Sequence, residues 1–201
     1  MNLNTGDLIL FHSKQSLFGS LIQYFTGTDY SHVGIILKDP TFLDKSLSGL
    51  YIWESGFEKC GDAEDKKYKL GVQITDFKKV FEASKKGSNI YIRKLITNKN
   101  IITNEKLKKI YDVVHNKPYD ILPSDWLEAW LKYDSSPQKK NRFWCSALTG
   151  YIYTKLGLLP SNFDWSISIP ADFSTENSNK NFILKKNVKL SKEIFINDIK
   201  F

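Results

Sequence analysis

The sequence predicts an α+β fold, a small antiparallel sheet or barrel with one helix packed across it. Strand-like runs come first, between residues 6 and 95, and most of the helical patterns follow, between residues 103 and 160. Strands and helices that are segregated along the chain are typical of this class. The length of 201 residues and the 41% share of hydrophobic residues suit one globular domain of ordinary size.

Turn signals separate the predicted strands. A Gly-Asp turn opens the first strand at residues 6–11. The apolar runs at 31–37 and 50–55 are joined by a loop rich in Pro, Asp, Ser and Gly, which predicts an antiparallel hairpin with a long tip. Two more strand-like runs, at 72–77 and 89–95, continue the sheet.

Five segments carry apolar residues at helical spacing, and they are residues 15–25, 76–87, 103–118, 124–133 and 143–160. We expect Gly87 to end the second of these helices and Pro118 to end the third. The last of them places Cys145 in its first turn and ends at Gly157.

The net charge of +7 comes almost entirely from lysine, because Arg93 and Arg142 are the only arginines among 29 basic residues. Arginine is the usual reader of phosphates and guanine edges, and the lysines lie in short runs with acidic residues between them. We therefore expect a solvated surface and no nucleic-acid partner. An anionic membrane surface stays open as a partner, and so does the oligomeric state.

No segment of the sequence indicates export or a membrane span. No apolar run approaches the ~18 residues needed to cross a bilayer, and the N-terminus lacks the basic start and cleavage site of a signal peptide. The two cysteines make no disulfide framework, and the chain contains no Asn-x-Ser/Thr acceptor. These features predict an intracellular protein, in the cytoplasm or inside a host cell.

Cys145 is the candidate nucleophile. At the first turn of a helix, unsatisfied N–H groups and the helix dipole favour a thiolate, and the same amides can receive an oxyanion. On its position alone, Cys145 also fits a buried small hydrophobic residue. Cys60 fits an exposed loop thiol, His12 a polar turn after the first strand, and His115 a structural position on a helix. Because these residues show no ligand spacing, we expect no metal site and no cofactor.

A thiolate nucleophile needs a base, and the base needs a group that orients it. His32 begins an apolar strand. If residues 39 and 49 bracket the hairpin loop, the numbers of paired residues sum to about 88, which sets His32 opposite residue 56 to within a few residues. Glu54 then lies within roughly 4.5–8 Å at Cβ, close enough to bond the imidazole. An outward-facing Glu54 is the alternative, with Asp29 or a main-chain carbonyl as the third group.

The segments "GDLILF", "SHVGIIL", "YIWES", "FWCSAL" and "IPADF", in that order, resemble the circularly permuted, NlpC-type papain-like cysteine hydrolases. This family includes the YiiX-like bacterial proteins, a set of poxvirus proteins and, more remotely, lecithin-retinol acyltransferase. The resemblance, which also includes "KPYD", implies a permuted papain-like domain over residues 1–173. We expect residues 174–201 to form a polar loop and a C-terminal extension with edge strands, packed on the same domain. The viral relatives leave association with a virion open.

The resemblance implies a catalytic triad of Cys145, His32 and Glu54, in which the third residue varies in kind across the family. It implies a cysteine hydrolase, a thiol protease or amidase that cleaves an amide bond of a peptide or peptide-like conjugate. A lipid ester hydrolase or acyltransferase acting on an acyl substrate is one alternative, and a non-catalytic binding protein that retains the fold is another. Trp126 and Trp130, one turn apart, would line an apolar wall for the substrate unless they pack inward as core residues.

Overall fold

The computed structural model describes residues 1–13, 28–57, 60–97, 99–120, 140–177 and 179–201. An antiparallel six-stranded sheet with the order β4-β3-β2-β1-β5-β8 forms its centre. Its strands are β1 (Leu8–Ser13), β2 (His32–Lys38), β3 (Leu50–Phe57), β4 (Leu70–Asp76), β5 (Ser88–Arg93) and β8 (Ile194–Phe195). A second, two-stranded sheet pairs β6 (Leu95–Ile96) with β7 (Lys189–Leu190).

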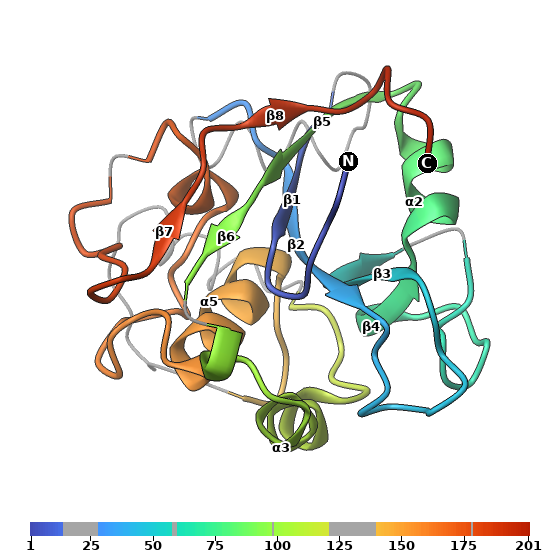
Figure 1. The fold of residues 1–201 in the computed structure, drawn as a ribbon, viewed down its shortest axis with the longest axis horizontal. Helices are drawn as coiled ribbons and strands as arrows, with labels where there is room; N and C mark the ends of the chain where they lie inside the picture. The colour runs from blue at the N-terminus through green and yellow to red at the C-terminus, as the bar shows by residue number, and fades with distance from the viewer. Residues whose placement is uncertain (14–27, 58–59, 98, 121–139, 178) are drawn as a thin grey trace.

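Helices lie on both sides of the sheet, as Figure 1 shows for α5 and α2. The described helices are α2 (Phe77–Ser84), α3 (Asn104–Val114) and α5 (Cys145–Leu156), with short 3-10 turns η1 (Lys99–Ile101) and η2 (Pro170–Phe173). An antiparallel sheet covered by helices that follow most of the strands is an α+β architecture, as the order of elements predicts. The helices expected at 15–25 and 124–133, with Trp126 and Trp130, lie outside the described residues.

Local sequence explains where the helices begin and end. Thr103 caps α3, since its side chain accepts a hydrogen bond from the backbone N–H of Lys106. The prediction that Gly87 ends α2 is wrong, because the helix stops at Ser84 and Lys85 is its C-cap. The chain turns into the next strand at Ser88, so a longer α2 has no room before the sheet resumes.

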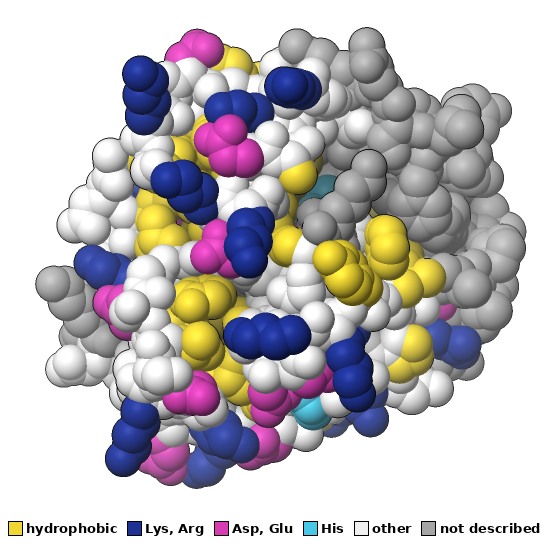
Figure 2. Space-filling model, turned by 90° about the vertical axis from the view of Figure 1, so that its right-hand side faces the viewer, with side chains coloured by type: hydrophobic (Ala, Val, Ile, Leu, Met, Phe, Trp, Pro, Cys, Tyr) yellow, Lys and Arg dark blue, Asp and Glu magenta, His cyan; other side chains and the backbone are white. Residues whose placement is uncertain are grey.

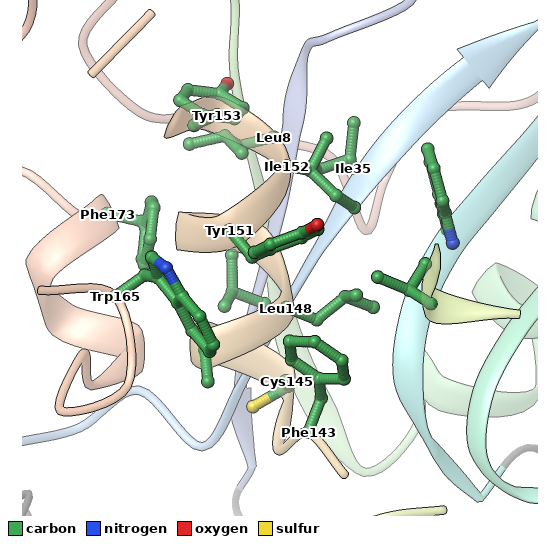
Figure 3. Close-up of a cluster of buried hydrophobic side chains, with 14 of the residues drawn as sticks. Leu8, Ile35, Phe143, Cys145, Leu148, Tyr151, Ile152, Tyr153, Trp165 and Phe173 are labelled. Carbon is green, nitrogen blue, oxygen red and sulfur yellow. The ribbon is translucent and has the colours of Figure 1, made fainter. Parts of the chain in front are cut away.

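Two hydrophobic clusters sandwich the sheet, because alternate residues of each strand point to opposite faces. One cluster packs α3 and α5 against one face, and the other packs α2 and the C-terminal segment against the opposite face. Helix α5 crosses the first cluster, and all of its residues except Lys155 are buried (Figure 3). This burial explains why the helix has hydrophobic or small residues all round instead of a single apolar stripe.

The C-terminal segment is part of the same packing. β8 pairs with β5 at the edge of the sheet, and Ile196 is fully buried in the cluster around α2. Arg93 of β5 donates to the carbonyl oxygens of Phe173, Ser174 and Ser191, which fixes the start and the end of the intervening segment. The two edge strands exist, but each spans only two residues. No helix among the described residues has the length and apolar character needed to cross a membrane.

Candidate active site

The hairpin of β2 and β3 has the predicted register. Ile35 pairs with Trp53 and Lys38 with Leu50, so the residue numbers sum to 88. Asp39 and Gly49 close its tip, because the N–H of Asp39 donates to the Gly49 carbonyl at 2.8 Å. The bracket assumed from the sequence is therefore confirmed.

The two strands separate before His32, and this separation creates the site. The β2–β3 ladder stops at the pair Ile35–Trp53, whereas β3 continues along β4 as far as Phe57. The segment that leads into α5 approaches the released part of β3, where the buried Ser55 hydroxyl donates to the Phe143 carbonyl at 2.6 Å. This contact directs the start of α5 toward the first residues of β2.

His32 and Glu54 are joined across the separated strands. His32 Nε2 lies 2.6 Å from Glu54 Oε2. The register predicts this nearness, because it sets His32 opposite residue 56, two residues beyond Glu54 on the same strand. Glu54 is fully buried, and the His32 side chain is 18% exposed. The other carboxylate oxygen of Glu54, Oε1, accepts a hydrogen bond from Thr75 Oγ1 at 2.9 Å. Both oxygens of a charged, buried side chain are thus occupied, which is what makes its burial tolerable.

Two glycines leave room for this pair. A Cβ on Gly34 would lie 2.8 Å from Ile52 Cγ2 and 3.4 Å from Glu54 Cβ. A Cβ on Gly56 would lie 3.2 Å from His32 Cε1. Any side chain at these two positions would therefore compete with the imidazole and the carboxylate for space.

Cys145 is the first residue of α5 and is buried beside the hydrophobic cluster, next to Phe143 (Figure 3). The N-cap residue Trp144 offers no side-chain hydrogen bond to the first turn, so that turn has no side-chain acceptor at its N-cap. Instead, Trp144 Nε1 and Ser146 Oγ both donate to the Ser168 carbonyl, at 3.0 and 2.6 Å. These bonds tie the start of α5 to the segment just before "IPADF".

The charges of Cys145 and His32 reinforce each other. Burial raises the pKa of the Cys145 thiol, but the charge and hydrogen bond of His32 and the backbone amides of Val33 and Ser146 outweigh it and lower the pKa below its usual value. Burial lowers the pKa of His32, but its interactions with Cys145 and Glu54 raise it well above the usual value. Both shifts act in the direction of a thiolate beside an imidazolium. Because the Nε2 atom of His32 is hydrogen-bonded to Glu54, Nδ1 is the ring nitrogen left for the hydrogen bond with Cys145.

The "KPYD" landmark lies next to this site. Pro118 bridges to Gly71 at the edge of β4, and Tyr119 bridges in parallel to Phe143. Tyr119 is buried, and burial together with the negative charges of Cys145 and Asp120 raises its pKa well above the usual value. The landmark therefore forms the layer between β4 and the segment that leads into α5.

The remaining titratable candidates lie elsewhere. His12 belongs to β1 and is half-buried, with its ring 6.5 Å from that of Tyr30, so the expected polar turn is wrong. Cys60 is half-buried against the cluster around α2, where we expected an exposed thiol. His115 caps the end of α3 and contacts Glu64 at 3.4 Å, a structural position. Asp29, the other candidate for the third group, is exposed.

The sequence analysis did not assign a role in the site to Thr75 or Gly56. Thr75 lies within the strand predicted at 72–77, and Gly56 directly follows the strand predicted at 50–55. A threonine in the run "VQITDF" can be assigned to Glu54 only if the register of β3 and β4 is known. The segment that joins these strands is too long to fix that register from turn geometry.

The fold and the site together define a class: an α+β protein with a strand histidine and a cysteine at the start of a buried helix. Among solved structures, the chain is similar to the metalloprotein yiiX from Escherichia coli O157:H7, with a TM-score of 0.51 and 19% identity over 98% of this chain and 100% of that chain. At this identity, the likeness shows a shared fold. No protein-family model matches the sequence, and no curated protein matches it either.

Proposed function

We propose that this protein is a cysteine-dependent hydrolase in which Cys145 is the nucleophile, His32 the general acid and base, and Glu54 the residue that orients the imidazole. The observation that carries the proposal is the part-buried hydrogen bond of 2.6 Å between His32 and Glu54, on a ring that also hydrogen-bonds Cys145. This is the arrangement of a nucleophile, a base and an orienting group that defines activated thiols.

The reaction follows from the charges at rest. The Cys145 thiolate attacks an acyl carbonyl, and its sulfur–carbon bond forms as the carbonyl π electrons move to oxygen. Backbone N–H groups at the start of α5 stabilise that oxyanion. The His32 imidazolium gives its proton to the leaving nitrogen or oxygen as the bond to carbon breaks, which leaves an acyl thioester on Cys145. Neutral His32 then takes a proton from water, the resulting hydroxide releases the acid, and the thiolate and imidazolium are restored.

Glu54 keeps the ring in place through this cycle. Its carboxylate accepts from Nε2–H, so the proton on Nδ1 is the one exchanged with the reacting groups. Because Glu54 is fully buried and each of its two oxygens accepts a hydrogen bond, it orients the ring without taking the proton itself.

We rank an amide of a peptide or peptide-like conjugate first as substrate, and a lipid ester or acyl transfer second. An apolar surface suits a hydrophobic peptide side chain as well as an acyl chain. Phe57 and Leu70 are a cross-strand pair just beyond Ser55, and they are 60% and 53% exposed. On the face that looks to the right in Figure 1, exposed hydrophobic side chains lie among lysines (Figure 2). A surface of this kind suits an apolar segment with a polar or anionic flank.

The structural neighbour yiiX is a metalloprotein. No group of three or more His, Cys, Asp or Glu within the described ranges is arranged to hold a metal ion. Both oxygens of Glu54 are engaged by His32 and Thr75. These residues do not fit a metal centre, and the mechanism uses none.

The test is covalent trapping of Cys145 by a panel of peptide-based and fatty-acyl electrophiles, read by mass spectrometry, with Cys145→Ala as the blank and Cys60→Ser as the matched control. We expect peptide-based probes to label Cys145 fastest and Cys60→Ser to behave as the wild type. A preference for fatty-acyl probes would reverse the ranking of substrates. A thiol that reacts with small alkylating agents but with none of the substrate-like probes would favour the non-catalytic binding protein.

A further inference from the structure

The Glu54 carboxylate is fully buried and is held by a hydrogen bond on each of its two oxygens. Glu54 and Thr75 are both fully buried, and the Thr75 hydroxyl donates to Glu54 Oε1 at 2.9 Å. His32 occupies the opposite oxygen, Oε2, at 2.6 Å. The carboxylate plane is therefore fixed by one donor on each oxygen.

We propose that Thr75 is a positioning residue, which keeps the Glu54 carboxylate turned toward His32. The inference deepens the proposed function and rests on it for its catalytic consequence. Thr75 acts through its hydrogen bond to Glu54 and is not itself one of the three residues proposed as the triad.

The register of β3 and β4 explains why this task falls to Thr75. Gln73 stands directly opposite Glu54, but its side-chain Nε2 donates to the Gly56 carbonyl at 3.0 Å and is not directed at the carboxylate. Thr75 pairs with Ile52 and is the diagonal neighbour of Glu54 on the same face. From this diagonal position, the short Thr75 side chain reaches the Glu54 carboxylate, with a hydrogen bond of 2.9 Å.

The physical consequence is a matter of charge. A buried carboxylate oxygen without a donor bears the full cost of its desolvation. If the Thr75 hydroxyl is removed, the carboxylate turns or draws the proton of Nε2 toward itself, and both changes weaken the imidazolium next to Cys145. Among the residues that the structure describes, Cys145 and Glu54 are the groups whose charges and hydrogen bonds raise the pKa of His32.

The experiment compares Thr75→Val, which removes the hydroxyl and keeps the shape, with Thr75→Ser, which keeps the hydroxyl. The readout is the rate of iodoacetamide labelling of Cys145 across pH, measured by mass spectrometry on the full chain. Thr154→Val is the matched control, because the Thr154 hydroxyl is buried on α5 and has no hydrogen-bond partner in the part of the chain that the structure describes. Thermal unfolding of each variant checks that it folds.

We expect the labelling midpoint of Thr75→Val to rise by about one pH unit, which is a rate loss of about tenfold below the midpoint. Thr75→Ser and Thr154→Val should keep the wild-type midpoint. A midpoint in Thr75→Val that stays in place or falls, or an equal shift in Thr75→Ser, would overturn the inference. If Thr75→Val does not fold, Thr75→Ala gives the same comparison.

This outcome is separate from that of the trapping experiment. An unchanged midpoint in Thr75→Val, with Cys145 still trapped by substrate-like probes, overturns the role of Thr75 alone. A shifted midpoint, with no trapping by any probe, leaves Thr75 as the residue that positions Glu54 and removes the hydrolase.

Discussion

Replacing Glu54 by glutamine removes one negative charge and little else. The glutamine side chain retains an oxygen that can accept from His32 Nε2 and an amide that can face the Thr75 hydroxyl, so the geometry is preserved. The substitution therefore isolates the effect of charge on the imidazolium and, through it, on the Cys145 thiol.

The structure sets the magnitude. An opposite charge in contact shifts a pKa by about 1–3 units. Cys145 contributes more than Glu54 to the raised pKa of His32, so the loss of Glu54 lowers that pKa less than the loss of Cys145 would. Because His32 is the largest influence that lowers the pKa of Cys145, that thiol follows in the opposite direction. We expect Glu54→Gln to slow alkylation of Cys145 below its midpoint by up to about tenfold.

His32→Ala should have a larger effect, since it removes the imidazolium altogether. The Cys145 thiol then keeps the burial that raises its pKa and loses the charge and hydrogen bond of His32, the largest influences that lower it. The sign of the pH dependence follows: the wild-type thiolate persists below the usual thiol pKa and is lost only when the pH falls through the lowered value. Alkylation near pH 6.5 should therefore slow by more than the roughly tenfold expected for Glu54→Gln.

The assay is timed labelling with iodoacetamide between about pH 5 and 9, followed by mass spectrometry of the peptides that contain Cys145 and Cys60. Cys60 lies outside the site, against the cluster around α2, and serves as the internal comparison in the same sample. The reasoning is refuted if Glu54→Gln costs as much as His32→Ala, or if Cys145 and Cys60 react at equal rates near pH 6.5 in the wild type.

Two further substitutions test how the site is built. Gly56→Ala places a methyl group 3.2 Å from His32 Cε1 and should slow low-pH alkylation severalfold, while calorimetry finds an unfolding temperature close to that of the wild type; unchanged alkylation would mean that the ring has room to spare. Ser55→Ala should cost only about 0.5–1.5 kcal/mol, because the Phe143 carbonyl keeps its bond from the Asp120 N–H. The corresponding drop in unfolding temperature is about 1–6 °C, and a much larger drop would show that Ser55 holds the start of α5 by itself.

The sequence by itself determined the hairpin and therefore the nearness of His32 and Glu54. Strand alternation and a loop with recognisable ends fix a register, because a slip of one residue would turn every side chain to the other face of the sheet. The position of Cys145 near the start of a helix was equally accessible, since the helical spacing of apolar residues and the helix-ending Gly157 are local signals. A local signal can also mislead, as it did for the predicted helix end at Gly87. Helix α2 ends at Ser84 because the sheet, and not the glycine, sets where the chain turns into β5.

Only the tertiary structure decided which groups surround these residues. The separation of β2 from β3 beyond Ile35 and Trp53 admits the start of α5, and it depends on α5 packing against the sheet. The donation from Thr75 to Glu54 depends on the pairing of β3 with β4 across a long connection. Such contacts arise between segments far apart in the chain, and no local signal specifies them, because their geometry is the outcome of burying a common core.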